Sequence, residues 1–474
     1  MMPECFADDP YRKVPYEGLS LISDPIHGYI PFTVPYSKEG GCTEKDIIDA
    51  CWMQRLRYIN QLQSARWVYP SAEHSRFVHS LGAMHLAGRF AKQLYPSLCE
   101  VAQDCPSFCF IEALLRVAVL LHDVGHGPFC HFFDHHFLSQ FKLTHEKLGQ
   151  AIIVREMSHI LKKLRRSPSG DFAAGEQINP VHVAFLINKD DAYKTPRSYP
   201  RWLVMLRPLF SGIFTADNLD YVLRDSYMCC VAVGPVDVNR LVYYVFFSPQ
   251  GLTIHKAGLP ALSMFLNARS YLYRNVYYHR TVRSLDLHLK DIFPETIRFL
   301  FPYNPIERLD AYVDLTDWSL LLEVKSWRHS KSKVKRLLSS EWDKILMRDV
   351  KWKMAYDTTL TINRMERKKV VIDSDILEDA IRRRLPSSLK AIPFRVDIAT
   401  QDPRPMNPLR MGERQIYVFD PSTCGVSKEA LSECVDAIPA ALIQCRVYSL
   451  RHDHDDVISR TAKEVMESGL LPLP

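Results

Sequence analysis

Histidine and aspartate gather in one short segment of this chain in a way that suits metal binding. Six of the eighteen histidines lie between His122 and His145, within and just after the string LLHDVGHGPFCHFFDHHF. His122 and Asp123 are adjacent at the end of an apolar stretch, shortly before two glycines. Imidazole nitrogen and carboxylate oxygen together suit a borderline or hard divalent ion and leave positions open for water and phosphate. The segment therefore predicts a metal site that performs chemistry.

Two residues elsewhere are expected to complete the ligand set. His79 lies upstream in SRFVHSLGAMHLAG, an otherwise apolar setting with the spacing of an amphipathic helix. Asp217 lies downstream in ADNLDYVLRDS, near the start of a second expected helix. Taken alone, His79 would be interpreted as a core histidine with a hydrogen-bond partner. The order His, His-Asp, Asp instead predicts one ion held by His79, His122, Asp123 and Asp217.

The strings around these residues resemble the HD-domain deoxynucleoside triphosphate triphosphohydrolases. The shared strings are DPIHGYI, QRLRYINQL, SRFVHSLG, HDVGHGPF, THE, LDYVLRD and, more loosely, ARSYLYRNVYYHR, from residue 24 to about 280. The nearest resemblance is to the vertebrate enzyme that joins a SAM domain to an HD domain, and to bacterial dGTPase-like relatives, although no SAM domain is expected in these residues. It implies hydrolysis of a deoxynucleoside triphosphate (dNTP) to deoxynucleoside and inorganic triphosphate. It also implies one transition metal (Mn, Fe or Zn), with Mg²⁺ on the substrate phosphates.

The same resemblance implies roles for residues around the metal. His131 is expected to protonate the leaving 5′ oxygen, with Asp134 and His145 orienting it. An arginine suits phosphate contacts, and a tyrosine of the family packs where a ribose 2′-hydroxyl would project. The implied catalytic residues are His126, His131, Asp134 and His145. The implied substrate contacts are Gln61, Leu62, Arg76, Tyr221, Asp225, Arg269 and Tyr277.

Asp49, Gln54 and Arg57 match a set that binds the guanine of an activating nucleotide between subunits of the vertebrate enzyme. A carboxylate can accept from the guanine N1 and N2 donors, and arginine can donate to O6 or N7. The alternative interpretation, given equal weight, is that these residues cap and salt-bridge one helix. Ser20 stands where the family has the accompanying lysine. The resemblance implies a homo-oligomer, a dimer or tetramer, with GTP or a dNTP as activator.

Departures from the family keep other functions open. Asn218 replaces a phosphate-binding lysine, and losing such a contact removes about 1.5–3 kcal/mol. Tyr273 and Tyr278 replace a histidine and a glutamine near the base, so base preference is not carried over. One alternative is another HD phosphohydrolase, a nucleotidase or cyclic-nucleotide phosphodiesterase. A second is a catalytically silent nucleotide sensor that binds nucleic acid.

The elements that position these residues are expected to be mainly helical. Apolar residues recur at three- and four-residue spacing from Asp46 to about Leu164, and helical character returns from Pro208 to about Phe301, broken by a turn at 248–251. After residue 305, helical basic sequence continues to about Leu385, and the strand-like strings FRVDIA, RQIYVFD and IQCRVYSL follow. We predict a mainly α fold: an HD-superfamily helical domain at residues 1–305, whose first 45 residues wrap on it, and a smaller α+β lobe at 306–474, regulatory or oligomerising.

Composition indicates a globular, cytoplasmic protein. Hydrophobic residues make up 47% and charged residues 24% of the 474 residues, and no apolar run is long enough to span a bilayer. The twelve cysteines form no C-x-x-C pair and suit a reducing compartment. A net charge of +6 suits anionic small molecules. Basic runs at 325–336, 364–369 and 382–384 are interpreted as solvated helix faces, with a surface that binds a regulatory nucleotide or nucleic acid as the alternative.

Overall fold

Three helices at the centre of the larger body carry most of the residues singled out above. They are α3 (Arg76–Val101), α4 (Phe108–Leu120) and α11 (Ala216–Met228), and α3 packs against both of the others. Every residue of α4 from Phe110 to Leu120 is buried, as expected of a central helix with apolar residues on all sides. The end of α4 therefore delivers the next residues of the chain into the interior.

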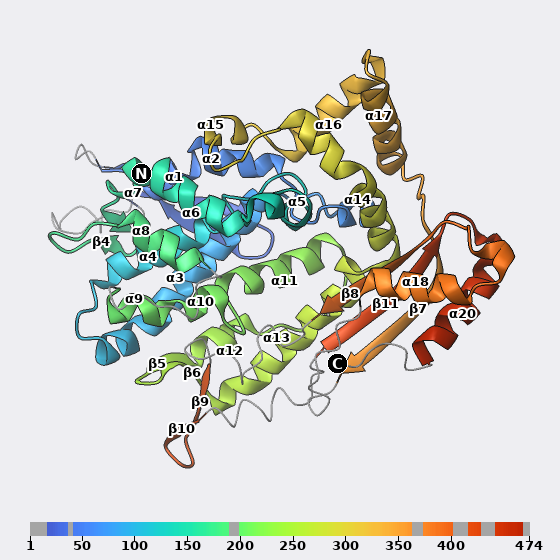
Figure 1. The fold of residues 1–474 in the computed structure, drawn as a ribbon. Helices are drawn as coiled ribbons and strands as arrows, with labels where there is room; N and C mark the ends of the chain where they lie inside the picture. The colour runs from blue at the N-terminus through green and yellow to red at the C-terminus, as the bar shows by residue number, and fades with distance from the viewer. Residues whose placement is uncertain are drawn as a thin grey trace, which may run out of the picture.

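The protein is described here by a computed structural model that covers residues 17–36, 41–188, 199–362, 373–401, 416–427 and 441–467. Figure 1 shows a large helical body and, at its right, a smaller lobe in which strands lie beside two helices. This arrangement confirms the predicted fold class. No helix in the described ranges combines the length and the apolar character that a membrane span requires.

The large body contains many short helices around the central three, and two longer ones at its edge. The α helices are α1 (Glu44–Ile48), α2 (Cys51–Gln54), α5 (His131–His136), α6 (His145–Arg155), α7 (Ser158–Leu161), α8 (Pro180–Ile187), α9 (Arg201–Leu206), α10 (Pro208–Ser211), α12 (Val238–Tyr243), α13 (Leu259–Leu272), α14 (Arg280–Leu300), α15 (Leu309–Tyr312), α16 (Asp317–Ser326) and α17 (Lys333–Leu346). A π-helical turn, Tyr273–Tyr277, joins α13 to the segment before α14. Short 3-10 helices occupy Arg55–Tyr58, Ala65–Trp67, Leu138–Phe141, Lys256–Gly258, Trp327–His329, Ser387–Leu389 and His452–His454.

Small antiparallel hairpins accompany the helices of the large body. β1 (Leu19–Asp24) and β2 (Gly28–Thr33) form the first, whose turn uses Gly28 at a φ of +73°. β3 (Arg166–Ser167) and β4 (Gly170–Asp171) form a minimal hairpin. The predicted turn at 248–251 is confirmed, because it joins β5 (Val245–Ser248) to β6 (Gly251–His255). β9 (Tyr417–Asp420) then pairs with β6 in parallel, and β10 (Gly425–Ser427) pairs with β9.

The smaller lobe is a three-stranded antiparallel sheet covered by helices. The strand order is β7 (Lys353–Ile362), β11 (Ala441–Ser449), β8 (Phe394–Gln401), with α18 (Ser374–Arg384) and α20 (Asp455–Glu467) packed on it. The string FRVDIA lies in β8, all but the last residue of IQCRVYSL lies in β11, and the last four residues of RQIYVFD form β9, as predicted. The prediction of helix through to Leu385 was wrong for β7. The string KMAYDTTLTI is rich in β-branched residues, and its pairing with β11 along the whole strand makes it a strand.

Burial divides the described residues into two hydrophobic clusters. The larger runs from the first hairpin through Ile345 on α17 and includes Ile416 and Val418 beside β6. The smaller joins α18, α20 and the three-stranded sheet. The division predicted after residue 305 stays a prediction, although this packing favours a point after residue 346. The lobe also contacts α14 through polar groups, since Arg283 donates to both oxygens of Asp397 at 2.6 and 3.0 Å.

The basic runs of the C-terminal half differ in how much of them is described. The run at 364–369 lies outside the described residues. In the run at 325–336, Arg328 pairs with Asp343 of α17 at 2.8 Å. Within α17, Lys344 pairs with Glu341 at 2.5 Å. On α18, Arg382 pairs with Glu378 one turn earlier at 3.1 Å. Such partly exposed pairs fit the interpretation as solvated helix faces.

Candidate active site

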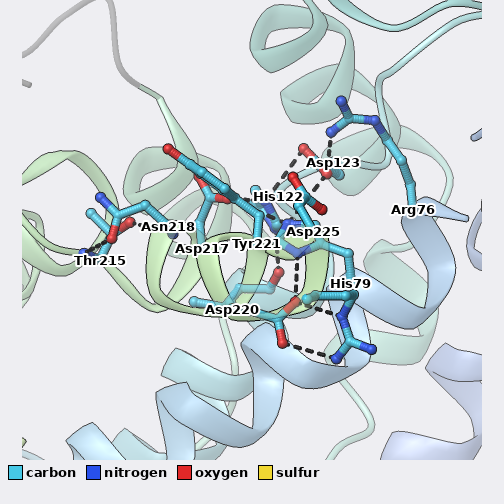
Figure 2. A network of polar contacts seen from close by, with 12 residues as sticks. Arg76, His79, His122, Asp123, Thr215, Asp217, Asn218, Asp220, Tyr221 and Asp225 are labelled. Atoms are coloured by element: carbon cyan, nitrogen blue, oxygen red, sulfur yellow. Dashed lines mark hydrogen bonds and ion pairs between the residues drawn. The ribbon is translucent and has the colours of Figure 1, made fainter. Parts of the chain in front are cut away.

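The four predicted metal ligands come from three elements and meet inside the helical body. His79 lies on the first turn of α3, His122 and Asp123 directly follow α4, and Asp217 lies in the first turn of α11. His79, Asp123 and His122 are buried, and the Asp217 side chain is 23% exposed. Figure 2 shows their polar ends pointing toward one another.

The distances between their polar atoms suit a shared ion. Nε2 of His79 lies 3.3 Å from Oδ1 of Asp217 and 3.8 Å from Oδ2 of Asp123. Nε2 of His122 lies 3.3 Å from Oδ1 of Asp123 and 3.6 Å from Oδ1 of Asp217. Ligand atoms about 2.1 Å from a common ion lie roughly 3.0 to 3.4 Å apart in octahedral or tetrahedral geometry. The ligand atoms of His79, His122 and Asp123 all lie within 4.8 Å of one another. Asp217 lies outside that group, although its Oδ1 is close to both imidazoles.

Both imidazoles also present the correct nitrogen. Nδ1 of His79 lies 2.8 Å from a carboxylate oxygen of Asp220, and Nδ1 of His122 lies 2.6 Å from the carbonyl oxygen of Val119. Because these partners only accept, each Nδ1 carries a proton, and Nε2 is the atom whose lone pair a metal would use. Burial opposes the charged form of His79, but its contacts with Asp217 and Asp220 raise its pKa to about 10, so a bound ion would replace a proton there. Both Nε2 atoms are buried without a hydrogen-bond partner among the described residues. Such lone pairs are what a divalent ion would occupy, so the residues fit the metal.

Arg76 closes one side of this centre. Its Nη1 lies 2.5 Å from Oδ2 of Asp123, and its Nε donates to Sγ of Cys130 at 2.8 Å. Burial alone would raise the pKa of Asp123, but the positive charges of Arg76 and His122 hold it well below its usual range. Asp123 is therefore an anion, as a metal ligand must be.

A second cluster lies directly beside the first. Its members, His126, His131, Asp134 and His145, have ligand-type atoms within 4.8 Å of one another. The rings of His126 and His145 stack with centroids 3.8 Å apart, and Nε2 of His126 lies 3.3 Å from Oδ1 of Asp123. Nδ1 of His145 lies 2.5 Å from Oδ2 of Asp134. The predicted catalytic residues are thus grouped next to the metal centre.

His131 is the exposed member of this cluster. Its side chain is 57% exposed, and its Nδ1 lies 3.6 Å from Oδ2 of Asp134, beyond hydrogen-bond length. The chain reaches it through Phe129 and Cys130, two consecutive residues with φ of 60° and 53°. Non-glycine residues in this region cost on the order of 1–3 kcal/mol each. This strained turn aims His131 outward, where a substrate could meet it.

His131 and Arg76 both face a large cavity of about 760 Å³. The cavity extends from Arg76, which contacts Asp123, to β8 of the smaller lobe, and its wall includes residues of the π-helical turn. His122 and Asp217 line a separate, smaller pocket. Its volume falls in the range of sites for nucleotides and other small molecules. The other predicted substrate contacts on its wall are Gln61, Leu62, Tyr221, Asp225 and Tyr277.

One predicted contact, Arg269, lies just behind this wall. Its Nε donates to the Tyr221 hydroxyl at 2.8 Å, and its Nη1 is buried without a hydrogen-bond partner among the described residues. Gln61 has a similar feature, because its buried Oε1 also lacks a partner there. Both groups can therefore bind a ligand without breaking a contact that the protein already makes.

Comparison with known proteins shows which family this part of the chain resembles. The HD domain family matches residues 76–192, which include His79, His122, Asp123 and the whole second cluster. This part of the chain is therefore similar to HD domains. HD domains bind a divalent metal through histidine and aspartate, and the four side chains described above are the candidate site for it here.

The proteins similar to this chain include one whose name states an activity. It is 40% identical to deoxynucleoside triphosphate triphosphohydrolase SAMHD1 of Bos taurus over 335 residues, 65% of this chain and 54% of that protein. It is 28% identical to Uncharacterized protein YwfO of Bacillus subtilis over 323 residues, 65% of this chain and 66% of that protein. The chain spans about half to two thirds of the length of the curated relatives that it matches. The predicted family resemblance is confirmed.

A solved structure shares the fold. The crystal structure of a hypothetical protein from Aquifex aeolicus matches with a TM-score of 0.66 at 24% identity. The match covers 94% of this chain and 99% of that one, so the similarity extends over the HD body and the smaller lobe.

Asn218, which stands where the family has a lysine, is engaged in a helix cap. Its side-chain oxygen accepts from the amide of Thr215 at 2.7 Å, and its own amide donates to Oγ1 of Thr215 at 3.0 Å. This reciprocal capping box begins α11 and so fixes the turn that carries Asp217. The residue is used for structure in this chain.

The residues predicted to bind a regulatory nucleotide lie along the surface stretch from α1 to the 3-10 helix Arg55–Tyr58. Asp49 pairs with Lys45, and Oε1 of Gln54 accepts from Nε of Arg57 at 2.7 Å. The Arg57 guanidinium also lies 3.8 Å from the centroid of the Phe77 ring. These contacts are those of the local capping and salt-bridge alternative, and the nucleotide role stays a prediction.

Several residues around the candidate metal centre and the cavity were not predicted from the sequence. His74 contacts a carboxylate oxygen of Asp225 at 2.8 Å, and Cys130 donates to the carbonyl oxygen of Asn60 at 3.2 Å. Burial raises the pKa of Cys130 to about 12, which keeps its thiol a donor. Asp220 and His27 lie behind His79. His27 stands in the string DPIHGYI, so the shared string was a signal, but nothing in it indicated a partner almost 200 residues away.

Proposed function

We propose that this protein hydrolyses dNTPs to deoxynucleoside and inorganic triphosphate. The main support is Arg76, which both lines a cavity of nucleotide size and contacts Asp123 of the candidate metal centre. The cavity carries Tyr221, Asp225 and Tyr277, which suit a sugar, and reaches Arg76, which contacts Asp123. A nucleotide held by these groups would place its phosphates at the metal.

The phosphate end of the proposed site combines an ion with arginine. When bound, a divalent ion neutralises phosphate oxygens and lowers the pKa of a water molecule. Arg76 is held by Asp123 and Cys130, so its remaining N–H groups can pair with phosphate oxygens. The unpartnered Nη1 of Arg269 supplies a second cationic donor. Charge neutralisation and positioning of this kind are the main requirements of phosphoryl transfer.

The leaving-group end depends on the second cluster. We assign His131 as the acid that gives a proton to the departing 5′ oxygen, because it is the member exposed to the cavity. Asp134 is held by His145, and in the substrate complex the 3.6 Å contact from Nδ1 of His131 to Asp134 would close to a hydrogen bond. His126 packs against both rings and separates them from Asp123.

A panel of nucleotides tests the proposal. Purified protein would be incubated with Mn²⁺ or Mg²⁺ and with dNTPs, NTPs and dNMPs, and the phosphate products separated by anion exchange. Inorganic triphosphate released from dNTPs is the expected result. Monophosphate released from dNMPs, with dNTPs intact, would remove the proposal.

A second candidate is another HD phosphohydrolase, a nucleotidase or cyclic-nucleotide phosphodiesterase. The observation that favours it is the engagement of Asn218 in the α11 capping box, which leaves one cation fewer for a triphosphate. The nucleotide panel separates the two, because a shorter phosphate chain would then be the better substrate. A silent nucleotide sensor is the third candidate and predicts binding without any product.

We also propose a homo-oligomer, a dimer or tetramer, that GTP or a dNTP stabilises through Asp49, Gln54 and Arg57. Sedimentation with and without these nucleotides tests it, and a fully active, unchanged monomer would contradict it. The transition metal, Mn, Fe or Zn, is to be identified by elemental analysis of the purified protein. Nucleic-acid binding by the basic smaller lobe and a cytoplasmic location also stay proposals.

A further inference from the structure

The turn of the first hairpin reaches the metal centre through one buried carboxylate. Asp220 is 0% exposed. Nε2 of His27, in the β1–β2 turn, lies 2.7 Å from its Oδ1, and Nδ1 of His79 lies 2.8 Å from its Oδ2. One aspartate therefore connects a hairpin residue to a predicted metal ligand.

Arg224 ties the same turn to the same carboxylate. Its Nε and Nη2 donate to both oxygens of Asp220 at 2.8 and 2.9 Å, and its Nη1 donates to Oδ2 of Asp24 at 2.8 Å. The other oxygen of Asp24 accepts from the amides of Ile26 and His27, each at 2.9 Å. Asp24 therefore binds the backbone within the turn, and Arg224 connects the turn to Asp220. Figure 2 shows Asp220 beside His79.

α3, the helix that carries His79, has a glycine where it meets Asp220 and Arg224. Gly82 follows His79 by three residues on α3, and a Cβ at Gly82 would lie 2.0 Å from Oδ1 of Asp220 and 2.2 Å from Nη2 of Arg224. Any side chain there would displace the carboxylate from His79. The glycine is therefore a separate indication that α3 and α11 are shaped around this contact.

We propose that His27 and Asp24 are positioning residues of the metal centre. The hairpin turn holds Asp220 in place, Asp220 holds Nδ1 of His79, and Nε2 of His79 then faces the ion. Partners of this kind orient a ligating histidine, and their loss lowers metal affinity about 10- to 100-fold. This inference rests on the metal centre and not on the choice of substrate.

Metal binding by His27 variants of the full chain tests the proposal. Metal-free protein would be titrated with Mn²⁺ in competition with a fluorescent chelator. His27→Phe keeps a ring but loses the hydrogen bond to Asp220, and His27→Asn is too short to reach it. Both are expected to weaken Mn²⁺ binding about 10- to 100-fold. His27→Gln can still donate and is expected to stay within about threefold of the wild type, since most of the positioning is retained.

His85→Phe is the matched control. The His85 ring lies 5.2 Å from that of His27, and no hydrogen bond joins it to Asp220 in the described structure. Its Mn²⁺ affinity should equal that of the wild type. Near-UV circular dichroism of the metal-free proteins identifies folded variants, and His27→Asn carries the test if His27→Phe does not fold.

Wild-type Mn²⁺ affinity in a folded His27→Phe or His27→Asn protein would overturn the proposal. An equal loss of affinity in His85→Phe would also overturn it, because the effect would then come from packing. A wild-type protein that binds Mn²⁺ but hydrolyses no dNTP would remove the proposed function and leave this inference standing.

Discussion

The hydroxyl of Tyr277 donates to Oδ2 of Asp225 at 2.5 Å, at the sugar end of the large cavity. The other oxygen of Asp225 contacts Nε2 of His74 at 2.8 Å, so the carboxylate is held from both sides. Because Tyr277 is the last residue of the π-helical turn and is fixed by this bond, its ring cannot easily leave the cavity. A fixed ring can exclude an extra hydroxyl on a substrate by its volume.

This relationship predicts how sugar selectivity can be changed. Tyr277→Ala should raise the ratio of kcat/KM for an NTP to that for its dNTP by about 10- to 100-fold, because space opens for the 2′-hydroxyl. Tyr277→Phe keeps the ring and should keep the discrimination. Paired initial rates with one dNTP and its ribonucleotide give the ratio. An unchanged ratio in the alanine variant would mean that Tyr277 does not set the selectivity.

Removal of the negative charge of Asp123, a predicted metal ligand, gives a second prediction. Asp123→Asn keeps the size of the side chain but removes the anion that faces His122, His79 and Arg76. The purified variant should contain less transition metal, and its activity should fall about 100-fold or more. Dialysis of the wild type against a chelator should abolish activity, and added Mn²⁺ should restore it.

Elemental analysis and rates of the same samples check this prediction. Asp310→Asn is the control, because Asp310 is exposed and its partner is Arg308, not a predicted metal ligand. If Asp123→Asn retained both metal and activity, the ligand assignment would be wrong.

The exposed histidine of the second cluster gives a third prediction. His131→Asn should lower kcat about 10²- to 10⁴-fold, because the leaving oxygen would depart without a proton. KM and metal content should change little, since His131 is not among the predicted metal ligands. Steady-state rates and elemental analysis measure these effects, with the exposed His159→Asn on α7 as control. A variant that loses metal together with activity would instead assign His131 to the metal centre.

The helices of the HD site could be predicted because their signals are local. Apolar spacing places His79 on a helix, and an apolar run followed by glycines places His122 and Asp123 at a helix end. The capping box that begins α11 also consists of neighbours, Thr215 and Asn218. Sequence alone was enough to predict that these side chains point inward.

The remainder depends on contacts between distant segments. β7 follows a helical stretch in the sequence, and its pairing with β11, from 79 to 96 residues further along the chain, makes it a strand. His27 gains its role only through Asp220, 193 residues away. The wall that β8 adds to the cavity follows from the ion pair of Arg283 with Asp397, which no local pattern predicts. Tertiary contacts of this kind override local propensity.

A buried carboxylate on α14 predicts how stability depends on pH. Burial raises the pKa of Asp286 to about 6, opposed by the charge of Arg283 and by the hydrogen bond from Ser64. The folded protein therefore binds this proton more tightly than the unfolded chain does. Below about pH 4 both states are protonated. From pH 4 to 6 only the unfolded state ionises, so this group lowers the free energy of unfolding as pH rises, by at most about 3 kcal/mol in total.

Asp286→Asn removes that dependence, because an amide does not titrate and can still accept from Ser64 at the position of Oδ1. The difference in unfolding free energy, variant minus wild type, should increase between pH 4 and pH 6 and then stay constant. Urea unfolding at several pH values measures it, with Asp291→Asn on the same helix as control, because Asp291 is partly exposed and pairs with Lys351. A difference that is constant from pH 4 to pH 7 would show that Asp286 ionises equally well in the folded and unfolded states.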